Sequence, residues 1–316
     1  HTEGWMTPRS YKIPKELVKK GKAVIAVRVM DTGGTGGING SPGSISLQRS
    51  QTDDMQLAGN WKYQVSLTMK DIPHMPVNTA NEPNVPGFLF NAMLHPLIPY
   101  AIKGAIWYQG EANNERHQDY GVMFDAMIRG WRNAFHHYLP FYFVQITPWS
   151  GYADKNAAYL REQQADVAAT LRNTGMVVAG DLVNDLTDIH PSLKRQVGER
   201  LANMALKNSY HKEDIQPYSP MLKSFRVDGR KVIVTTTAIG KLACKDKVIR
   251  HFEVVDKEGN LHPAKASILK NGDISVIADK VKEPVGVRYC FSNDAMPNLF
   301  DSNGLPLAPF RTDRKK

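Results

Sequence analysis

The spacing of apolar residues changes along the chain, and each change predicts a different kind of structure. In the first part, apolar and β-branched residues form continuous runs at residues 23–29 and 61–67. Such runs predict strands. Residues 71–86, in contrast, are rich in Pro and Asn. Because proline cannot donate a backbone hydrogen bond, this stretch predicts an irregular connector.

In the middle of the chain, apolar runs alternate with segments whose apolar residues recur every three or four positions. The runs predict strands at residues 102–108, 141–146 and 176–179, the first of them buried. The spaced segments predict helices at residues 88–98, 114–135, 156–173 and 192–204. Ser192 is the expected N-cap of the last helix. Strands that alternate with helices in this way predict a parallel sheet of βαβ units.

From about Tyr218 onward the pattern returns to short apolar runs. They predict strands at residues 232–235, 252–255, 266–269, 274–277 and 285–289. The pairs Asp228-Gly229, Glu258-Gly259 and Asn271-Gly272 separate the runs, and such pairs favour the tight turns of hairpins. We therefore expect a small all-β domain at residues 218–316, after an α/β core at 61–217 and a β-rich segment at 1–60.

Length and composition allow two or three domains with their own cores. The chain has 316 residues, of which 42% are hydrophobic and 22% charged, as in an ordinary globular protein. A formal charge of +9 would suit nucleic acid, but the Lys and Arg residues are scattered, so we predict no nucleic-acid partner. No run reaches the roughly 18 apolar residues that a membrane-spanning helix needs, so we predict no membrane span.

Three further features bear on the kind of protein. Cys244 and Cys290 are the only cysteines, too few for a zinc site, and whether they pair is left open. The glycine-rich residues 33–40 lack the third glycine of a dinucleotide-binding loop, because Asn39 stands there, so we expect a flexible loop. The chain begins with His1 and shows no signal peptide, and we expect it to be the interior of a longer protein.

The first candidate for chemistry follows the predicted strand at 102–108. Gln109, Glu111 and Asn113 come directly after it, around Gly110. In an open α/β sheet, ligands bind just beyond the carboxyl ends of the strands. These three polar side chains would lie at that edge. A strand end followed by a helix cap is the structural alternative.

A second candidate lies on the loop between the strand at 176–179 and the next helix. Asp188 and His190 stand two residues apart there. A histidine can take a proton from a hydroxyl nucleophile and return it to the leaving group, while an aspartate holds the ring in place. Pro191 restrains His190 to extended geometry. Alone, such a pair is more often a capped turn. A catalytic interpretation of Asp188 and His190 therefore depends on the first candidate stretch, around Gly110.

Taken together, the two stretches resemble one known family. Residues 104–113, GAIWYQGEAN, are similar to the third sequence block of SGNH hydrolases, in the form found in sialate O-acetylesterases. Residues 188–202 look like the final catalytic block of the same enzymes. Further matches are residues 91–98, 143–145, 161–164 and 304–313. Residues 9–14 and 21–29 resemble the last strands of a galactose-binding-like jelly roll inserted in some members.

The resemblance implies a fold: an SGNH, flavodoxin-like, parallel-sheet hydrolase core that is incomplete at its N-terminus. The end of the inserted β-sandwich would occupy residues 1–60 and the all-β domain residues 218–316. The resemblance also implies a mechanism, a Ser-His-Asp acyl-enzyme route. In it Asn113 would donate to the oxyanion, His190 would be the general base, and Asp188 would orient it.

Some assignments from the resemblance are less direct. The wider SGNH group spaces its Asp and His one residue further apart, and Thr187 stands at that position here, so Asp188 is the chosen carboxylate and Asp185 the fallback. Gln109 and Glu111 would support the Asn113 loop or touch the sugar. Arg161 would meet a substrate carboxylate, with a structural ion pair as the alternative. No metal or other cofactor is predicted.

One departure from the family is decisive. SGNH enzymes carry the nucleophilic serine in a Gly-x-Ser-type block near the start of the catalytic domain, and a second block supplies an oxyanion glycine. Neither block is found here, and Ser41 and Ser44 follow the glycine-rich loop instead. We expect the serine to lie in a missing N-terminal part of the same protein.

The leading hypothesis is a carbohydrate O-acetylesterase that removes acetyl groups from sialic acid, with this chain alone inactive. An acetylxylan esterase or other sugar esterase on the same scaffold is the alternative within enzymes. A non-catalytic carbohydrate-binding protein, its β-modules binding the sugar, is the alternative from another class. An acetylated sugar is the expected partner, and the resemblance implies a secreted or periplasmic location.

Overall fold

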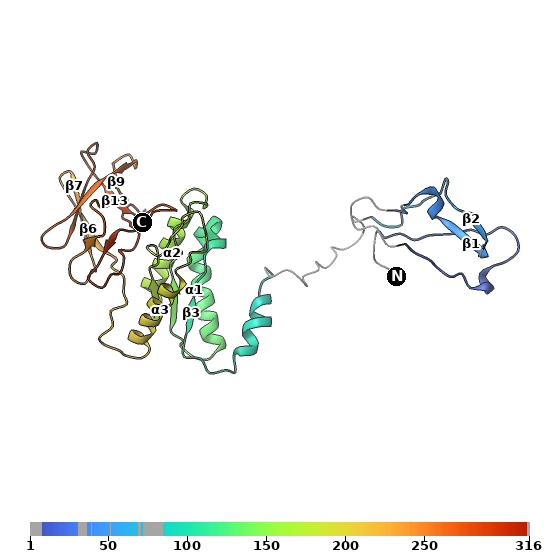
Figure 1. Ribbon diagram of the computed structural model, residues 1–316, viewed down its shortest axis with the longest axis horizontal. Coiled ribbons are helices and arrows are strands. Elements are labelled where there is room, and N and C mark those ends of the chain that lie inside the picture. The colour runs from blue at the N-terminus through green and yellow to red at the C-terminus, as the bar shows by residue number, and fades with distance from the viewer. Residues whose placement is uncertain are drawn as a thin grey trace. The chain divides into compact units, whose positions relative to one another are not determined.

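The computed structural model in Figure 1 describes residues 8–30, 37–38, 40–50, 52–68, 71 and 85–314. The chain divides into two compact units, residues 1–78 and 79–316. The candidate chemistry lies entirely in the second unit. The three-part division predicted from the sequence, at residues 1–60, 61–217 and 218–316, stays a prediction.

The described residues of the first unit contain one hairpin, in which β1 (Ser46–Ser50) pairs antiparallel with β2 (Asp53–Gln56). The strands predicted at 23–29 and 61–67 are not strands, and their apolar side chains face water, with Val24 87% and Tyr63 90% exposed. A β-branched run becomes a strand only when a neighbour accepts its backbone hydrogen bonds and covers one face. Most of the glycine-rich loop and of the proline-rich connector lies outside the described residues.

The parallel sheet predicted for the middle of the chain is confirmed. β3 (Ala105–Trp107), β4 (Phe141–Val144) and β5 (Thr174–Val177) pair in parallel in the order β3-β4-β5. All of β4 is buried. The expectation that the first strand is buried is wrong, because β3 lies at the edge of the sheet and its Ile106 is 68% exposed.

Helices cover both faces of this sheet (Figure 1). On one face, α1 (His117–Ala134) and α2 (Asn156–Thr170) enclose Phe141 and Phe143. On the other, α3 (Lys194–Asn208) packs over Tyr142 and Val144. The division follows from the strand itself, because alternate side chains point to opposite faces. No helix within the described ranges is long and apolar enough to cross a membrane.

The predicted helices are present, with differences at their ends. The segment predicted at 88–98 contains a short π-helix at Phe90–Leu94 and a 3-10 turn at His95–Leu97. Ser192 is not the N-cap of α3: Leu193 holds that position without a side-chain cap. The Ser192 hydroxyl instead accepts a hydrogen bond from the Asn184 amide at 3.0 Å. The Ser192 hydroxyl is therefore engaged by the preceding loop and not by the N-terminus of α3.

The region from Leu222 to Arg311 contains strands and no helix among its elements. These strands are β6 (Leu222–Asp228), β7 (Lys231–Thr236), β8 (Ala243–Cys244), β9 (Phe252–Val255), β10 (Leu261–Pro263), β11 (Lys265–Ile268), β12 (Ile274–Ile277), β13 (Gly286–Tyr289), β14 (Leu299–Phe300) and β15 (Phe310–Arg311). Two four-stranded antiparallel sheets, β10-β9-β13-β15 and β11-β12-β7-β6, share one apolar core. Gly229, Gly259 and Gly272 make the predicted hairpin turns with positive φ. Cys244 and Cys290 are not joined by a disulfide.

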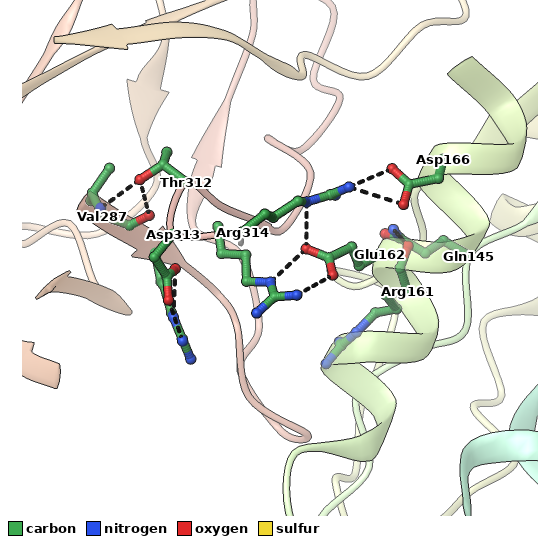
Figure 2. A network of polar contacts seen from close by, with 10 residues as sticks. Gln145, Arg161, Glu162, Asp166, Val287, Thr312, Asp313 and Arg314 are labelled. Atoms are coloured by element: carbon green, nitrogen blue, oxygen red, sulfur yellow. Dashed lines mark hydrogen bonds and ion pairs between the residues drawn. The ribbon is translucent and has the colours of Figure 1, made fainter. Parts of the chain in front are cut away.

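A polar network joins α2 to this β-rich region (Figure 2). Glu162 of α2, its side chain 6% exposed, accepts hydrogen bonds from Arg311 at 2.8 Å and pairs with Arg314 at 2.8 Å. Arg314 also pairs with Asp166, one turn further along α2, at 2.7 Å. The segment after β15 thereby returns to the helix that covers the parallel sheet.

Candidate active site

The loops that follow β3, β4 and β5 all leave the sheet at the carboxyl ends of the strands, because the strands are parallel. A buried glutamine on α2 holds two of these loops together. Gln164 Oε1 accepts a hydrogen bond from the Ile146 amide at 2.9 Å, and Gln164 Nε2 donates to the Gln109 carbonyl at 3.3 Å. The side chain is fully buried. The starts of both loops are therefore fixed to the helix above them.

Gln109 determines which way the Asn113 amide faces. Gln109 Nε2 donates to Asn113 Oδ1 at 2.6 Å, and the Tyr120 hydroxyl contacts the other end of the Gln109 amide at 3.4 Å. With its oxygen engaged, Asn113 keeps the Nδ2 donor, which has no hydrogen-bond partner in the part of the chain that the structure describes. Asn113 is half-buried at the start of a 3-10 helix, Glu111–Arg116. The arrangement presents the Asn113 Nδ2 donor beyond the carboxyl end of β3.

Gly110 makes this tight loop possible by close packing. A Cβ atom at this position would lie 2.7 Å from Ile146 Cγ2 and 3.1 Å from Leu160 Cδ2. Both neighbours are buried, so neither can move aside easily. The Gly110 carbonyl then accepts the Asn113 backbone N–H at 2.9 Å, which closes the turn. Close packing thus explains why a glycine stands at position 110 in the stretch 104–113.

The charge of Glu111 acts on three nearby tyrosines. The pKa values of Tyr108, Tyr120 and Tyr152 are all raised, first by burial and further by the negative charge of Glu111. Raised values keep these phenols protonated, and therefore able to donate, throughout the ordinary pH range. The prediction that Glu111 supports the loop or touches a sugar stays a prediction.

Asp188 and His190 are close to each other but do not form a full ring–carboxylate hydrogen bond. His190 Nδ1 lies 3.7 Å from Asp188 Oδ1, while the same oxygen accepts the His190 backbone N–H at 2.8 Å. The His190 side chain is 86% exposed and that of Asp188 56%. Closing the gap by less than about 1 Å would give a normal bond. Loops of free enzymes often hold catalytic groups this loosely.

Asp185, the fallback carboxylate, is already occupied. Its Oδ1 accepts the Thr187 backbone N–H at 2.8 Å and the Thr187 hydroxyl at 2.7 Å. These bonds favour the charged form and lower the pKa of Asp185. These bonds to Thr187 shape the loop, and of the two carboxylates Asp188 is the one in contact with the His190 ring.

Residues after β4, which the sequence did not single out, hold this loop. Trp149 Nε1 donates to the Thr187 carbonyl at 3.0 Å, and the Ser150 backbone N–H donates to the Leu186 carbonyl at 2.8 Å. The Trp149 ring also meets Tyr152 edge-on at 4.8 Å. The polar and aromatic string at 147–152 follows a buried strand, and this signal could have identified it.

Arg161 lies inside the molecule. Its side chain is 1% exposed, and Nη2 donates to the Ser292 carbonyl. Burial lowers the pKa of Arg161 to about 10. The neighbouring Glu162, not Arg161, makes the ion pairs of this helix turn. A role for Arg161 toward a substrate carboxylate stays a prediction.

The two candidate stretches leave the outer strands of the sheet, with β4 between them. Neighbouring strands lie about 4.8 Å apart, so strands separated by one other lie roughly 10 Å apart. The loops that begin after β3 and β5 therefore start on either side of the loop after β4. Among the described residues, no cluster of three or more His, Cys, Asp or Glu side chains could hold a metal ion.

Comparisons with known proteins give a consistent result. Residues 88–207 match the family model of the carbohydrate esterases described as sialic acid-specific acetylesterase. The sialate O-acetylesterase of Rattus norvegicus is 31% identical over 199 residues, which is 57% of this chain and 37% of that protein. The human sialate O-acetylesterase is 26% identical over 264 residues, covering 75% of this chain and 50% of that protein.

A solved structure agrees with these relatives. A carbohydrate acetylesterase from Xanthomonas citri superposes with a TM-score of 0.69 at 36% identity, over 75% of this chain and 56% of that one. The chain thus spans half or less of the length of the curated relatives named here. The matched region contains both candidate stretches.

Proposed function

We propose that this chain, whose residues 88–207 belong to the sialic acid-specific acetylesterase family of carbohydrate esterases, carries the oxyanion donor and the general base of a sugar O-acetylesterase. The observation that supports this best is the orientation of Asn113. Its oxygen is held by Gln109 and its N–H donor is left available. A donor of this kind stabilises the negative charge that develops on an ester carbonyl oxygen during acyl transfer.

In the proposed mechanism, a serine hydroxyl attacks the acetyl carbonyl carbon while His190 takes its proton. Asn113 Nδ2 donates to the oxygen that becomes negative. The intermediate collapses, His190 returns the proton to the departing sugar hydroxyl, and the serine keeps the acetyl group. Water then attacks the acetyl-serine by the same route, releasing acetate. Asp188 orients the His190 ring once the 3.7 Å gap has closed.

We place the nucleophilic serine outside residues 1–316. The exposed edge of β3 supports this: a further strand added there would end next to Gln109 and Asn113. A hydroxyl carried just past the end of that strand would lie beside the Asn113 donor. The missing N-terminal part of the same protein is the proposed source. O-acetylated sialic acid is the proposed substrate, and secretion to the cell exterior or periplasm the proposed location.

The test has two stages. Residues 1–316, folded by circular dichroism, should release no acetate from an aryl acetate and should not react stoichiometrically with a fluorophosphonate. The same chain extended upstream to include the serine block should release acetate from O-acetylated sialic acid. A panel that includes acetylated xylan separates the sugar classes. Stoichiometric labelling of one serine in residues 1–316 would show that the nucleophile has been misplaced.

Two variants of the active protein assign the roles. His190→Ala should lower kcat about 10³-fold or more, because it removes the general base. Asn113→Ala should lower kcat by about 10²–10³ with little change in KM, because the donor acts on the transition state. His137→Ala, an exposed histidine after α1, is the control and should change neither constant. A raised KM as the main effect of Asn113→Ala would mean that Asn113 binds sugar instead.

A further inference from the structure

A segment of the β-rich region reaches the loops of the candidate active site. β13 ends at Tyr289, and Cys290 adopts a left-handed conformation with φ of 46°. After this turn the chain contacts α2. Phe291 meets the ring of Tyr159 edge-on at 5.3 Å, and the Ser292 carbonyl accepts the bond from Arg161. The next residue, Asn293, is 8% exposed.

The Asn293 side chain binds the backbone between β4 and α2. Its Nδ2 donates to the carbonyls of Tyr152 at 2.8 Å and Asp154 at 2.6 Å, and it lies 3.3 Å from that of Ala153. Its Oδ1 accepts the Ala157 N–H, in the first turn of α2, at 3.2 Å. Carbonyls around the nitrogen and an N–H at the oxygen fix the orientation of this amide.

The same backbone stretch binds the loop of His190. The backbone carbonyl of Asn293 accepts a hydrogen bond from the backbone N–H of Trp149 at 3.0 Å. Trp149 and Ser150 in turn donate to the carbonyls of Thr187 and Leu186, next to Asp188. The contacts therefore run without a gap from Asn293, through residues 149–154, to the loop at 185–190.

We propose that Asn293 is a positioning residue for His190: it fixes the loop after β4, and that loop fixes the backbone from which His190 projects. This inference rests on the proposed function insofar as His190 is the general base. The β-rich region would then have a part in catalysis without touching substrate. It would give the exposed His190 side chain a fixed backbone from which to project. A misplacement of about 1 Å can cost about 10²-fold in turnover.

The alternative is that Asn293 merely caps α2, and Asn293→Asp distinguishes the two. The carboxylate keeps the acceptor for the Ala157 N–H and suits a helix N-terminus. It has lost both N–H donors, so the carbonyls of Tyr152 and Asp154 lose their partner. If Asn293 only caps the helix, Asn293→Asp should leave hydrogen exchange at Ser150 and His190 at the wild-type rate, whatever the buried carboxylate costs in overall stability. If it positions the loop, Asn293→Asp should resemble Asn293→Ala.

The matched control is Asn298→Ala. Asn298 is also a buried asparagine of the β-rich region, 3% exposed, and it bonds Asp246 Oδ2 at 3.0 Å, the Val248 carbonyl at 2.9 Å and the Arg250 N–H at 3.2 Å. All these partners lie within that region. Asn298→Ala should therefore lower thermal stability much as Asn293→Ala does, without loosening the loop at 185–190.

The first measurement is backbone hydrogen exchange at Ser150 and His190 in residues 1–316. It requires no turnover, so it tests the positioning even if the acetylesterase proposal fails. Asn293→Ala and Asn293→Asp should exchange at these amides at least about tenfold faster than wild type, and Asn298→Ala should not. Trp149→Phe keeps an aromatic side chain, smaller than the indole, but removes the Nε1 donor. It should speed exchange at His190 even if the buried variants do not fold.

The second measurement is kinetic, on the active protein with an aryl acetate and O-acetylated sialic acid. Asn293→Asp and Trp149→Phe should lower kcat by about tenfold or more, with KM within about twofold, because they misplace the base and leave the binding surface intact. Asn298→Ala should keep kcat within about twofold. Unchanged exchange at Ser150 and His190 in folded Asn293→Asp, or equal loss of kcat in Asn298→Ala, would overturn the proposal.

Discussion

The side chain of Asn113 could face either way on steric grounds, since its oxygen and nitrogen differ little in size. The bond from Gln109 at 2.6 Å removes that freedom. Gln109 is itself oriented, because the Tyr120 hydroxyl contacts its side-chain Oε1 and also donates to its backbone carbonyl at 3.1 Å. A side chain whose orientation is settled before the substrate arrives need not be ordered during the reaction. Three residues are thus needed to present one N–H group.

A prediction at the residue scale concerns Asp256, which lies away from the candidate site. Its Oδ2 is 2.7 Å from His262 Nε2, and this bond lowers the pKa of Asp256 to about 2. Because the folded value lies below the unfolded value of about 3.9, the pair stabilises the fold above about pH 4. That stabilisation is lost as the pH falls from about 4 towards 2.

Asp256→Asn should therefore be less stable than wild type at pH 6, and the difference should shrink between about pH 4 and pH 2.5. Urea unfolding followed by circular dichroism at several pH values measures it. Glu258→Gln, an exposed neighbour on the same turn, is the control. A stability difference that stays constant down to pH 2.5 would contradict the assignment.

The sequence offers candidate residues for chemistry more readily than it shows what positions them. Gln109, Glu111 and Asn113 stand beyond a strand, and a pattern of that kind is local. Asn293, in contrast, acts on residues 136 to 141 positions away. No spacing rule connects residues so distant. Only the folded chain brings them together.

At the scale of elements, α2 is joined by ion pairs to β15 and the residues that follow it (Figure 2). Glu162 is nearly buried, while its partners Arg311 and Arg314 are 20% and 45% exposed. Arg311 also lies over the ring of Tyr159 at 4.8 Å. Removing one partner of such a group leaves the other charge poorly solvated, which is costly.

Glu162→Gln should accordingly lower the free energy of unfolding by about 3 kcal/mol. Asp166→Asn, on the same helix, removes an exposed pair with Arg314 and should cost less than about 1 kcal/mol. Chemical unfolding of both variants at neutral pH measures the contrast. Equal effects for the two variants would mean that burial of Glu162 contributes little.

The helices and strands of the second unit were predictable to the extent that their own sequences are periodic. The spacing in α1 and the continuous apolar run of β4 correspond to the buried residues observed. β6 was missed, since its side chains are mostly exposed and give no burial pattern. The runs at 23–29 and 61–67 have strong strand propensity without a partner, and propensity alone does not make a sheet.

At the scale of the whole molecule, the open edge of β3 is the feature with the clearest consequence for behaviour in solution. An exposed strand edge offers unpaired backbone groups, and Ile106 adds an apolar side chain to it. Met93 and Leu97, which precede the strand, are also 68% and 55% exposed. Residues 1–316 should therefore self-associate as their concentration rises.

Ile106→Lys should shift residues 1–316 towards monomer in sedimentation velocity, because a charge on an edge strand discourages pairing. Val122→Lys is the matched control: Val122 is 76% exposed but lies on the helix α1 and not on the edge strand. It should leave the association unchanged. Equal dispersal by both substitutions would indicate a general effect of charge and not pairing along β3.

The joint at Glu162 also sets an order of events during protein synthesis. Arg311 follows Glu162 in the chain by 149 residues. At roughly 5–20 residues per second, a ribosome needs about 7–30 s to add that length. While the strands of the β-rich region are still being made, Glu162 of α2 therefore lacks its arginine partners. Arg161 lacks the Ser292 carbonyl for the same period. The charged surface of α2 that faces this region therefore stays in contact with water until the β-rich region has been made.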